Sequence, residues 1–240
     1  MSTVIDLKSL IDKEGGVSRS PSLSEDAAST LREMILLEKL PPGMALPERD
    51  LAEALNVSRT PMREAIRLLA NEGLVSYTPS RRPYVADPSL EEINDYLRVQ
   101  GCLEALAGEL ACSLASDREL ATIADINMSI ADAADAEGKL RAFRQDMQFH
   151  NAIVAAARNQ ALADTHKTYN ARLWRVRFLS SQRLQGRGET RREHLEIVEA
   201  LTARDPGRTA AALKKHLQTA ETNIAAALDE RAQAKQERSS

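Results

Sequence analysis

Apolar residues recur with a helical period in three short stretches near the N-terminus. In the first stretch, Ala28, Leu31 and Ile35 fall on one face of a helix, and the pattern stops at the breaker Pro41-Pro42-Gly43. Two further stretches follow, and the last of them stops at Asn71-Glu72-Gly73. The predicted helices span about 24–40, 48–55 and 58–71.

Two short stretches with the character of β-strands follow these helices. They are Leu74–Tyr77 and Tyr84–Ala86, and they flank the basic segment Pro79–Pro83. This arrangement predicts a β-hairpin with a basic tip. Three helices and a hairpin therefore make up a first domain at 22–87. Residues 1–21 lack sustained periodicity and are predicted to form a flexible arm.

Long helical patterns fill the rest of the chain. The capping boxes Ser89-x-x-Glu92 and Ser116-x-x-Glu119 predict where the first two long helices begin. Further helices are predicted at roughly 139–158, 161–183, 190–203 and 207–229. Six to seven helices at 88–230 are typical of an all-α bundle, and the charged residues 231–240 are predicted to fray. The expected fold class is mainly α, a helix-turn-helix with a hairpin wing followed by a helical bundle.

The composition agrees with a helical protein. Of the 240 residues, 43% are hydrophobic but only 3% are aromatic, which favours helices over β-sandwiches and barrels. The formal net charge is −3, which excludes binding to nucleic acid through bulk charge. Any binding to nucleic acid must therefore come from a local concentration of positive charge.

The two cysteines and the short apolar runs indicate a cytoplasmic protein. Cys102 and Cys112 lie ten residues apart in one predicted helix, a rise of about 15 Å that is too long for a disulfide. The chain also lacks an apolar run near the roughly 18 residues that a membrane span needs. We expect a reducing cytoplasm and no membrane span, and we interpret both cysteines as small core residues.

The segment Glu48–Arg67 has the spacing of a helix-turn-helix. Ala52 is small where two helices must approach, Asn56 stands in a turn that favours a positive φ, and Met62 is a core anchor of the second helix. These positions predict a two-helix unit whose second helix packs with one side and leaves the other side open.

Positive charge is concentrated around this unit. Arg59 and Arg63 fall next to the packed side of the second helix, near its N-terminal end, where they would reach phosphates and base edges in a major groove. Between residues 59 and 82 there are five arginines and two glutamates, a local charge of +3. The arginine stripe alone also fits an ordinary solvated helix. The basic hairpin beside it favours a DNA-docking surface.

Three segments carry the most specific pattern of this domain. They are Leu46-Pro47-Glu48-Arg49-Asp50-Leu51-Ala52, Val57-Ser58-Arg59-Thr60-Pro61-Met62-Arg63-Glu64-Ala65 and Glu72-Gly73-Leu74-Val75. Together they resemble the winged-helix domain of GntR-family regulators. The resemblance implies a homodimer that binds a palindromic operator in double-stranded DNA. The residues that it assigns to DNA contact are Arg49, Ser58, Arg59, Thr60, Arg63 and, in a wing without the family's usual Gly, Arg81.

Three of the four histidines fall at spacings that suit a metal site. Asp146 and His150 are four residues apart, so one helix face presents a carboxylate and an imidazole. His194 and His216 are equidistant from the turn between two predicted helices, so an antiparallel hairpin places them level, about 16 Å from the turn. One carboxylate and three imidazoles suit zinc, nickel or manganese. Spacing alone leaves open the commoner case of hydrogen-bonded core histidines. His166 has no partner at a useful spacing and is interpreted as a surface or packing residue.

A second resemblance covers this half of the chain. The pattern consists of Asp146-x-x-Phe149-His150, then Glu193-His194, then Asp205 and His216-Leu217. It resembles the FCD effector domain of the FadR subfamily. The resemblance implies a divalent metal held by Asp146, His150, His194 and His216, and a small organic acid as the effector.

One position departs from this family pattern. Family members often carry Arg four residues before the Glu of the first bundle helix, but here Gln100 precedes Glu104, and Arg98 lies about 200° around the helix from Gln100. We assign effector contact to Gln100, and a neutral or differently anchored ligand stays open. Most arginines of the basic run that follows are interpreted as solvated, with Arg175 and Arg177 as the candidates to project inward.

These expectations describe a cytoplasmic repressor that is relieved by a ligand. Two alternatives stay open. In the first the protein is a metal sensor and the ion is the signal. In the second it is a metal-dependent hydrolytic enzyme, because an ion with an open coordination position can activate water. No general base or nucleophile accompanies the four candidate ligands, so we expect that the protein is not an enzyme.

Overall fold

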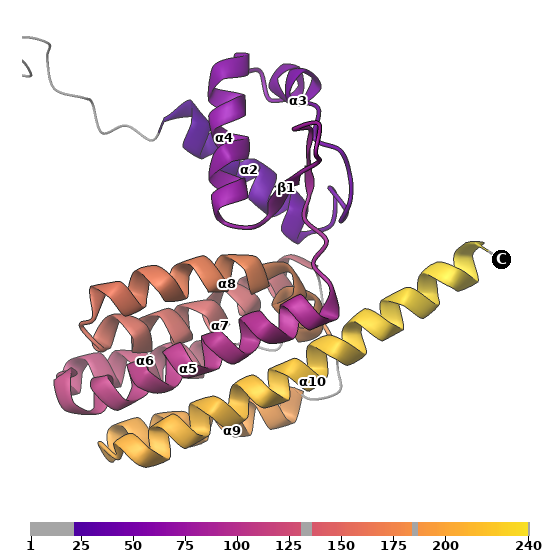
Figure 1. The fold of residues 1–240 in the computed structure, drawn as a ribbon. Helices are drawn as coiled ribbons and strands as arrows, with labels where there is room; N and C mark the ends of the chain where they lie inside the picture. Colours follow the sequence, from indigo (N-terminus) through magenta and orange to yellow (C-terminus); the bar gives the residue numbers. More distant parts are fainter. Residues whose placement is uncertain (1–21, 131–135, 184–186, 240) are drawn as a thin grey trace, which may run out of the picture.

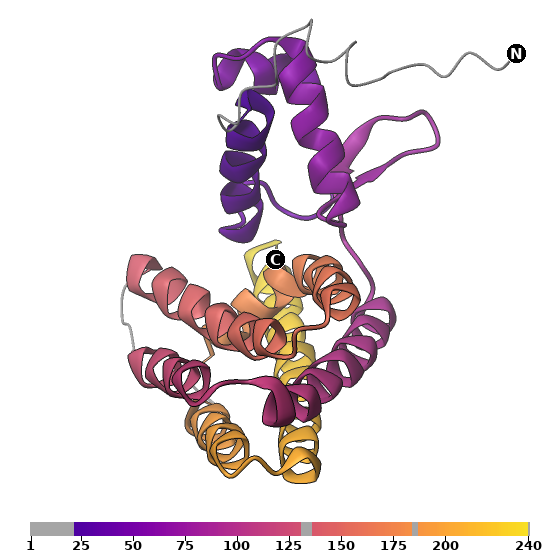
Figure 2. The same cartoon turned by 90° about the vertical axis from the view of Figure 1, so that its left-hand side faces the viewer.

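The computed structural model describes residues 22–130, 136–183 and 187–239, and the expected flexible arm at 1–21 lies outside them. The described chain is mainly helical with one two-stranded antiparallel sheet, as predicted. A small N-terminal domain lies against a larger bundle of long helices, and a short linker after the hairpin joins the two (Figures 1 and 2).

The N-terminal domain contains the predicted helices and hairpin. Its elements are α2 (Leu23–Leu36), α3 (Glu48–Ala54), α4 (Arg59–Asn71), β1 (Val75–Tyr77) and β2 (Pro83–Val85). The strands pair with Val75 opposite Val85, each within one residue of its predicted ends. One buried cluster joins all of these elements and includes Leu31, Ile35, Leu46, Met62, Ile66, Leu69 and Val85. The apolar stripes of the sequence are therefore the core of this domain.

The C-terminal bundle contains six helices in the described ranges, in agreement with the predicted six to seven. They are α5 (Leu90–Leu114), α6 (Asp117–Ser129), α7 (Ala136–Ala156), α8 (Gln160–Ser181), α9 (Arg187–Thr202) and α10 (Pro206–Ser239). Both predicted capping boxes are present, at Ser89 and at Ser116. Nowhere in the described ranges is a helix both long and apolar enough to cross a membrane.

The last helix differs from the sequence-based prediction. A frayed tail is expected from residue 231, but α10 continues as a helix to Ser239. Arg231 forms an ion pair with Glu38 of the N-terminal domain. This contact ties the C-terminal part of α10 to the N-terminal domain.

Small residues let α5 and α10 pack closely side by side (Figure 1). A Cβ at Gly108 would lie 2.7 Å from Cγ2 of the β-branched Thr209 and 2.5 Å from Leu213 Cδ1, so the close approach of the two helices favours glycine there. Cys112 continues this face of α5, and its Sγ lies 3.3 Å from Thr209 Oγ1. Cys112 is thus the expected core residue. For Cys102 the core prediction is wrong, because its position on α5 falls outside this face and its side chain is exposed.

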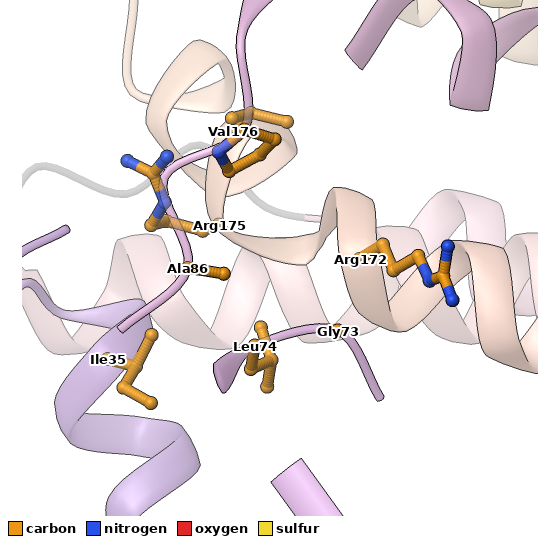
Figure 3. Close-up of a pocket in the computed structure, with 8 residues that line it drawn as sticks. Ile35, Gly73, Leu74, Ala86, Arg172, Arg175 and Val176 are labelled. Carbon is orange, nitrogen blue, oxygen red and sulfur yellow. The ribbon is translucent and has the colours of Figure 1, made fainter. Parts of the chain in front are cut away.

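Helix α8 holds the N-terminal domain through two arginines. Arg175 is 6% exposed, and its guanidinium lies 3.6 Å from the carboxylates of both Glu38, just after α2, and Asp87, in the linker. Arg172 packs on Gly73, where φ is +76° and a Cβ would lie 2.4 Å from Arg172 Cγ. Figure 3 shows the small pocket at this junction, which residues of both domains line, among them Ile35, Leu74 and Val176.

The substitution Arg175→Gln tests the contact between the domains. It removes the buried charge that two carboxylates face, so we expect the free energy of unfolding to fall by about 1–2 kcal/mol. The loss is smaller than for a fully buried pair because the side chains of Glu38 and Asp87 are 29% and 63% exposed. Urea unfolding measures it. The matched control is Arg98→Gln, which breaks an exposed pair with Asp95 and should cost less than about 1 kcal/mol. Equal losses in both variants would show that the Arg175 contact is an ordinary surface pair.

Candidate functional site

The N-terminal end of α4 forms an exposed cationic surface. Arg59, Thr60 and Arg63 are exposed, whereas Met62 and Ile66 on the neighbouring side are completely buried. Ser58, the N-cap residue of α4, makes no side-chain capping bond, so the backbone N–H groups of Arg59 and Thr60 stay available to an anion. The helix therefore offers arginine side chains and free N–H groups at the same end.

Turn geometry places this end of α4 as the sequence predicts. Asn56, between α3 and α4, has a φ of +52°, the left-handed conformation that asparagine tolerates. At the wing tip Arg81 also has a positive φ, of +59°, in a turn closed by a hydrogen bond from Arg81 N–H to Thr78 C=O. Figure 2 shows the hairpin projecting from the domain beside α4.

Charge pairing differs among the arginines of this surface. Arg49 lies 3.3 Å from the carboxylate of Asp50, and Arg67 lies 3.3 Å from that of Glu64. Three arginines that the sequence assigned to DNA contact differ from these two. Within the described residues, no ion pair is formed by Arg59, Arg63 or Arg81. Their charges remain available to a polyanion.

Three imidazoles from three helices meet inside the bundle. His150 comes from α7, His194 from α9 and His216 from α10. The ring centroids are 5.5 Å apart for His150 and His194, 5.1 Å for His150 and His216, and 4.7 Å for His194 and His216. One ligand nitrogen from each ring lies within 4.8 Å of the others. The prediction that His194 and His216 stand level across the α9–α10 turn is confirmed.

The fourth predicted ligand lies at the edge of this cluster. Asp146 precedes His150 by one turn of α7, and its Oδ1 is 3.5 Å from His194 Nε2. Its Oδ2 is 3.9 Å from the Arg177 guanidinium, and its side chain is 22% exposed. The structure therefore brings all four predicted residues to one place, with the carboxylate on the more open side.

Burial disfavours the charged form of two imidazoles in the cluster, His150 and His194. It lowers the pKa of His150 although the nearby Glu104 carboxylate opposes the shift. The pKa of His194 is lowered more strongly, first by burial and then by the neighbouring rings of His216 and His150, which also disfavour a positive charge there. A neutral imidazole carries a nitrogen lone pair, which is the form that binds metal ions.

Several polar atoms in this cluster have no hydrogen-bond partner. Among the described residues, both ring nitrogens of His150 and the Nε2 atom of His194 are buried and unpartnered. An unpartnered buried polar atom costs about 1–3 kcal/mol. One nitrogen from each of the three imidazoles, together with the Asp146 carboxylate, makes a donor set typical of a divalent transition ion. The residues therefore fit the predicted metal.

A buried carboxylate beside the imidazoles was not assigned from the sequence. Glu104 on α5 is 1% exposed, and its Oε1 accepts a hydrogen bond from Gln100 Nε2 at 3.1 Å and lies 3.2 Å from His166 Nε2. Its Oε2 is 2.8 Å from His150 Nδ1, although the two atoms are not aligned as a hydrogen bond. Burial raises the pKa of Glu104, but His150, His166 and Arg177 outweigh it and hold this pKa well below its ordinary value.

The structure also places three residues whose orientation the sequence left open, His166, Arg175 and Arg177. His166 is 1% exposed and contacts Glu104, so it is a buried packing residue with a polar partner that spacing did not reveal. Of the two candidate inward arginines, Arg177 faces the imidazoles and Arg175 faces the other domain. Arg177 is 5% exposed, and its Nη1 donates to Asn170 Oδ1 at 3.2 Å. The sequence did contain a pattern from which the inward orientation of His166 and Arg177 could be predicted, because positions 166, 170, 173 and 177 share one face of a helix.

Gln100, the predicted effector contact, lies in the same buried region. Its side chain is fully buried, and its Oε1 has no hydrogen-bond partner among the described residues. Arg98 pairs with Asp95 on the surface, so it faces away from the cluster as expected. A hydrogen-bond donor on a ligand would satisfy Gln100 Oε1.

Comparisons with known proteins agree with both halves of this description. The pattern of bacterial regulatory proteins of the gntR family matches residues 23–85, and the FCD domain matches residues 95–219, just over half of the chain. The HTH-type transcriptional repressor RspR of Escherichia coli is 28% identical over 188 residues, which cover 78% of this chain and 82% of RspR. The HTH-type transcriptional repressor NanR of Cronobacter sakazakii is 28% identical over 220 residues, 81% of this chain and 82% of NanR. Among solved structures, E. coli McbR/YncC superposes with a TM-score of 0.69 at 20% identity and covers 88% of this chain and 99% of its own, which shows a shared fold.

The substitution Glu104→Gln tests the charge of the buried carboxylate. Because the folded pKa lies below the unfolded one, ionised Glu104 stabilises the fold above its unfolded pKa, and this contribution is lost as pH falls through the folded pKa. We therefore expect the stability difference between wild type and Glu104→Gln to be largest near neutral pH and to shrink below about pH 4.3. Urea unfolding at a series of pH values measures it. A difference that does not change with pH would mean that Glu104 is not ionised in the fold.

Proposed function

The chain belongs to the gntR family of bacterial regulatory proteins and carries an FCD domain, and from this premise we propose a dimeric repressor that senses a small metabolite at a metal-containing pocket. Its family is one of DNA-binding transcriptional regulators and not of enzymes. The observation that carries the proposal is that one chain combines two features. Arginines without a carboxylate partner lie at the start of α4, and a buried cluster of three imidazoles lies in the bundle. Relatives that are named repressors support this direction of regulation.

The N-terminal domain contacts DNA through α4 and the wing. The start of α4 enters a major groove, where Arg59, Thr60 and Arg63 reach phosphates and base edges. Ser58 makes no capping bond and leaves the N–H groups of Arg59 and Thr60 open to a phosphate. Arg81 at the wing tip extends toward the minor groove. Bidentate arginine contacts to guanine supply sequence discrimination, whereas phosphate contacts supply salt-dependent affinity.

A homodimer explains an exposed apolar face on the bundle. Val99, Leu106 and Leu114 are 39%, 43% and 45% exposed and fall on one side of α5. Large apolar side chains in one exposed row are typical of a protein–protein contact. Two copies related by a two-fold axis present two α4 helices to a palindromic operator.

The imidazole cluster is the proposed metal site. His150, His194 and His216 with Asp146 would hold zinc, nickel or manganese, an assignment that the unpartnered nitrogens of the cluster support. Such an ion supplies a Lewis-acidic contact for an oxygen ligand. Gln100, with its unpartnered Oε1, and the buried guanidinium of Arg177 face the same region. They favour an organic acid that also carries a hydrogen-bond donor.

Helix α8 links the cluster to the DNA-binding domain. One face carries His166, Asn170 and Arg177 toward the cluster, and Arg172 and Arg175 on another side contact the N-terminal domain. A ligand that changes how Arg177 is held therefore acts on the helix that positions the other domain. Coupling energies between such sites are typically about 1–3 kcal/mol.

A metal sensor is the second candidate function. The three imidazoles lie on three different helices, so binding of an ion by itself changes how α7, α9 and α10 pack. DNA affinity that follows the free metal concentration without any organic ligand favours the sensor. DNA affinity that changes only when an organic acid is added to metal-loaded protein favours the proposed effector.

The substitutions Arg59→Ala and Arg63→Ala test the DNA-binding surface. Each removes a guanidinium that no described carboxylate neutralises, so operator binding should weaken by about 1–3 kcal/mol, with a smaller salt dependence if a phosphate contact is lost. Fluorescence anisotropy with a labelled operator selected from a random DNA pool measures both. The control Arg118→Ala removes an exposed arginine of the bundle and should leave binding unchanged. Unchanged affinity in the Arg59/Arg63 double variant would rule out this docking surface.

The substitution His194→Ala tests the metal site. It removes the imidazole between Asp146 and His216, so the affinity for zinc should fall at least about 10-fold. The gain in melting temperature on adding zinc should fall with it. The control His166→Gln changes a buried histidine outside the ligand set and should retain one ion per chain. Full metal content in His194→Ala, measured by elemental analysis after dialysis, would remove this residue from the site.

A further inference from the structure

Glu193 stands beside a predicted ligand but points elsewhere. It precedes His194 on α9, and successive side chains on a helix diverge by about 100°. The Oε2 atom of Glu193 lies 3.1 Å from His216 Nδ1 on α10, and its Oε1 accepts a hydrogen bond from Thr219 Oγ1 at 2.6 Å. The side chain is 5% exposed, so these two contacts hold both carboxylate oxygens out of water.

The contact with His216 fixes which ring nitrogen carries the proton. An ionised carboxylate can only accept a hydrogen bond, so Nδ1 of His216 must be the donor. A neutral imidazole has one N–H group, and its Nε2 atom therefore carries the lone pair. The other carboxylate oxygen accepts a hydrogen bond from Thr219 Oγ1, so Glu193 acts as an acceptor toward both neighbours.

We infer that Glu193 is a positioning residue of the candidate metal centre, which holds His216 as the Nδ1–H tautomer so that Nε2 is the atom offered to an ion. The expected effect of Glu193 on metal affinity rests on the proposed metal site. The tautomer itself is a property of the metal-free chain. Carboxylates that accept from the second nitrogen of a ligating histidine fix its orientation and raise its basicity.

Glu104 does not play the same role for His150. The 2.8 Å contact between Glu104 Oε2 and His150 Nδ1 is not aligned as a hydrogen bond, and Glu104 is shared with Gln100 and His166. Both nitrogens of His150 are left without a hydrogen-bond partner among the described residues. Glu193 is thus the carboxylate that makes a defined hydrogen bond to a candidate ligand ring.

The tautomer is measured first, by long-range proton–nitrogen NMR of metal-free protein labelled with ¹⁵N-histidine. We expect His216 as the Nδ1–H form in wild type and in Glu193→Gln, whose amide oxygen still accepts. We expect a mixture of tautomers in Glu193→Met. An Nε2–H form of His216 in wild type overturns the inference whether or not the protein binds a metal.

The effect on metal affinity is measured second, by competition of zinc with a chromophoric chelator. Glu193→Met should weaken zinc binding about 10- to 100-fold, and Glu193→Gln should recover part of the loss. The control Glu196→Gln removes a carboxylate from the same helix, where it pairs with Arg208, and should bind zinc as wild type does. If Glu193→Met does not fold, Thr219→Val, which frees one oxygen of Glu193, should show a smaller loss in the same direction.

The outcomes separate the two proposals. Wild-type protein that binds no zinc contradicts the proposed metal site and leaves the tautomer result standing on its own. Wild-type protein that binds zinc while Glu193→Met binds it equally well contradicts the role of Glu193 alone.

Discussion

The burial of three imidazoles beside a charged carboxylate is the constraint on which this structure depends. Neutral histidine rings with unpartnered nitrogens are expensive to hold out of water, and an ionised Glu104 is more expensive still. Such an arrangement persists when hydrogen bonds, opposite charges or a bound ion offset its cost. Contacts with Gln100, His166 and Arg177 offset the cost of burying the Glu104 carboxylate. The unpartnered imidazole nitrogens keep the lone pairs that a divalent ion would use.

The same helix that helps to neutralise this cluster also carries the second domain. On α8, Arg177 faces Glu104 and Asp146, and two residues earlier Arg175 faces Glu38 and Asp87 across the junction. A helix is stiff over two residues, so a shift that re-forms one set of contacts disturbs the other. Helix α8 therefore connects the buried cluster with the contact between the two domains.

Local pattern was enough to predict most of the fold. The apolar stripes, the two capping boxes and the turn at Asn56 predicted the helices, the hairpin and the exposed arginines, because each is determined by neighbours within a few residues. The level placement of His194 and His216 was also predictable, since a short turn fixes an antiparallel helix pair.

The rest of the site depends on contacts between residues distant in sequence. Glu104 and His166 are 62 positions apart, and no periodicity links them. The sequence predicted the same core position for Cys102 and Cys112. The face of α5 that packs closely against α10 contains Cys112 but not Cys102, which is exposed. In the part of α10 past residue 230, Arg231 meets Glu38, a partner far away in the chain that no local pattern predicts. Whether a polar side chain points inward is decided by the partner it finds there.

The most direct test of this account is anomalous diffraction from crystals of the full chain grown with zinc and recorded at the zinc absorption edge. We expect one strong peak per chain among His150, His194 and His216, with Asp146 alongside and Nε2 of His216 as the bonded atom. Crystals that bind zinc elsewhere and leave the three imidazoles without a peak would contradict it.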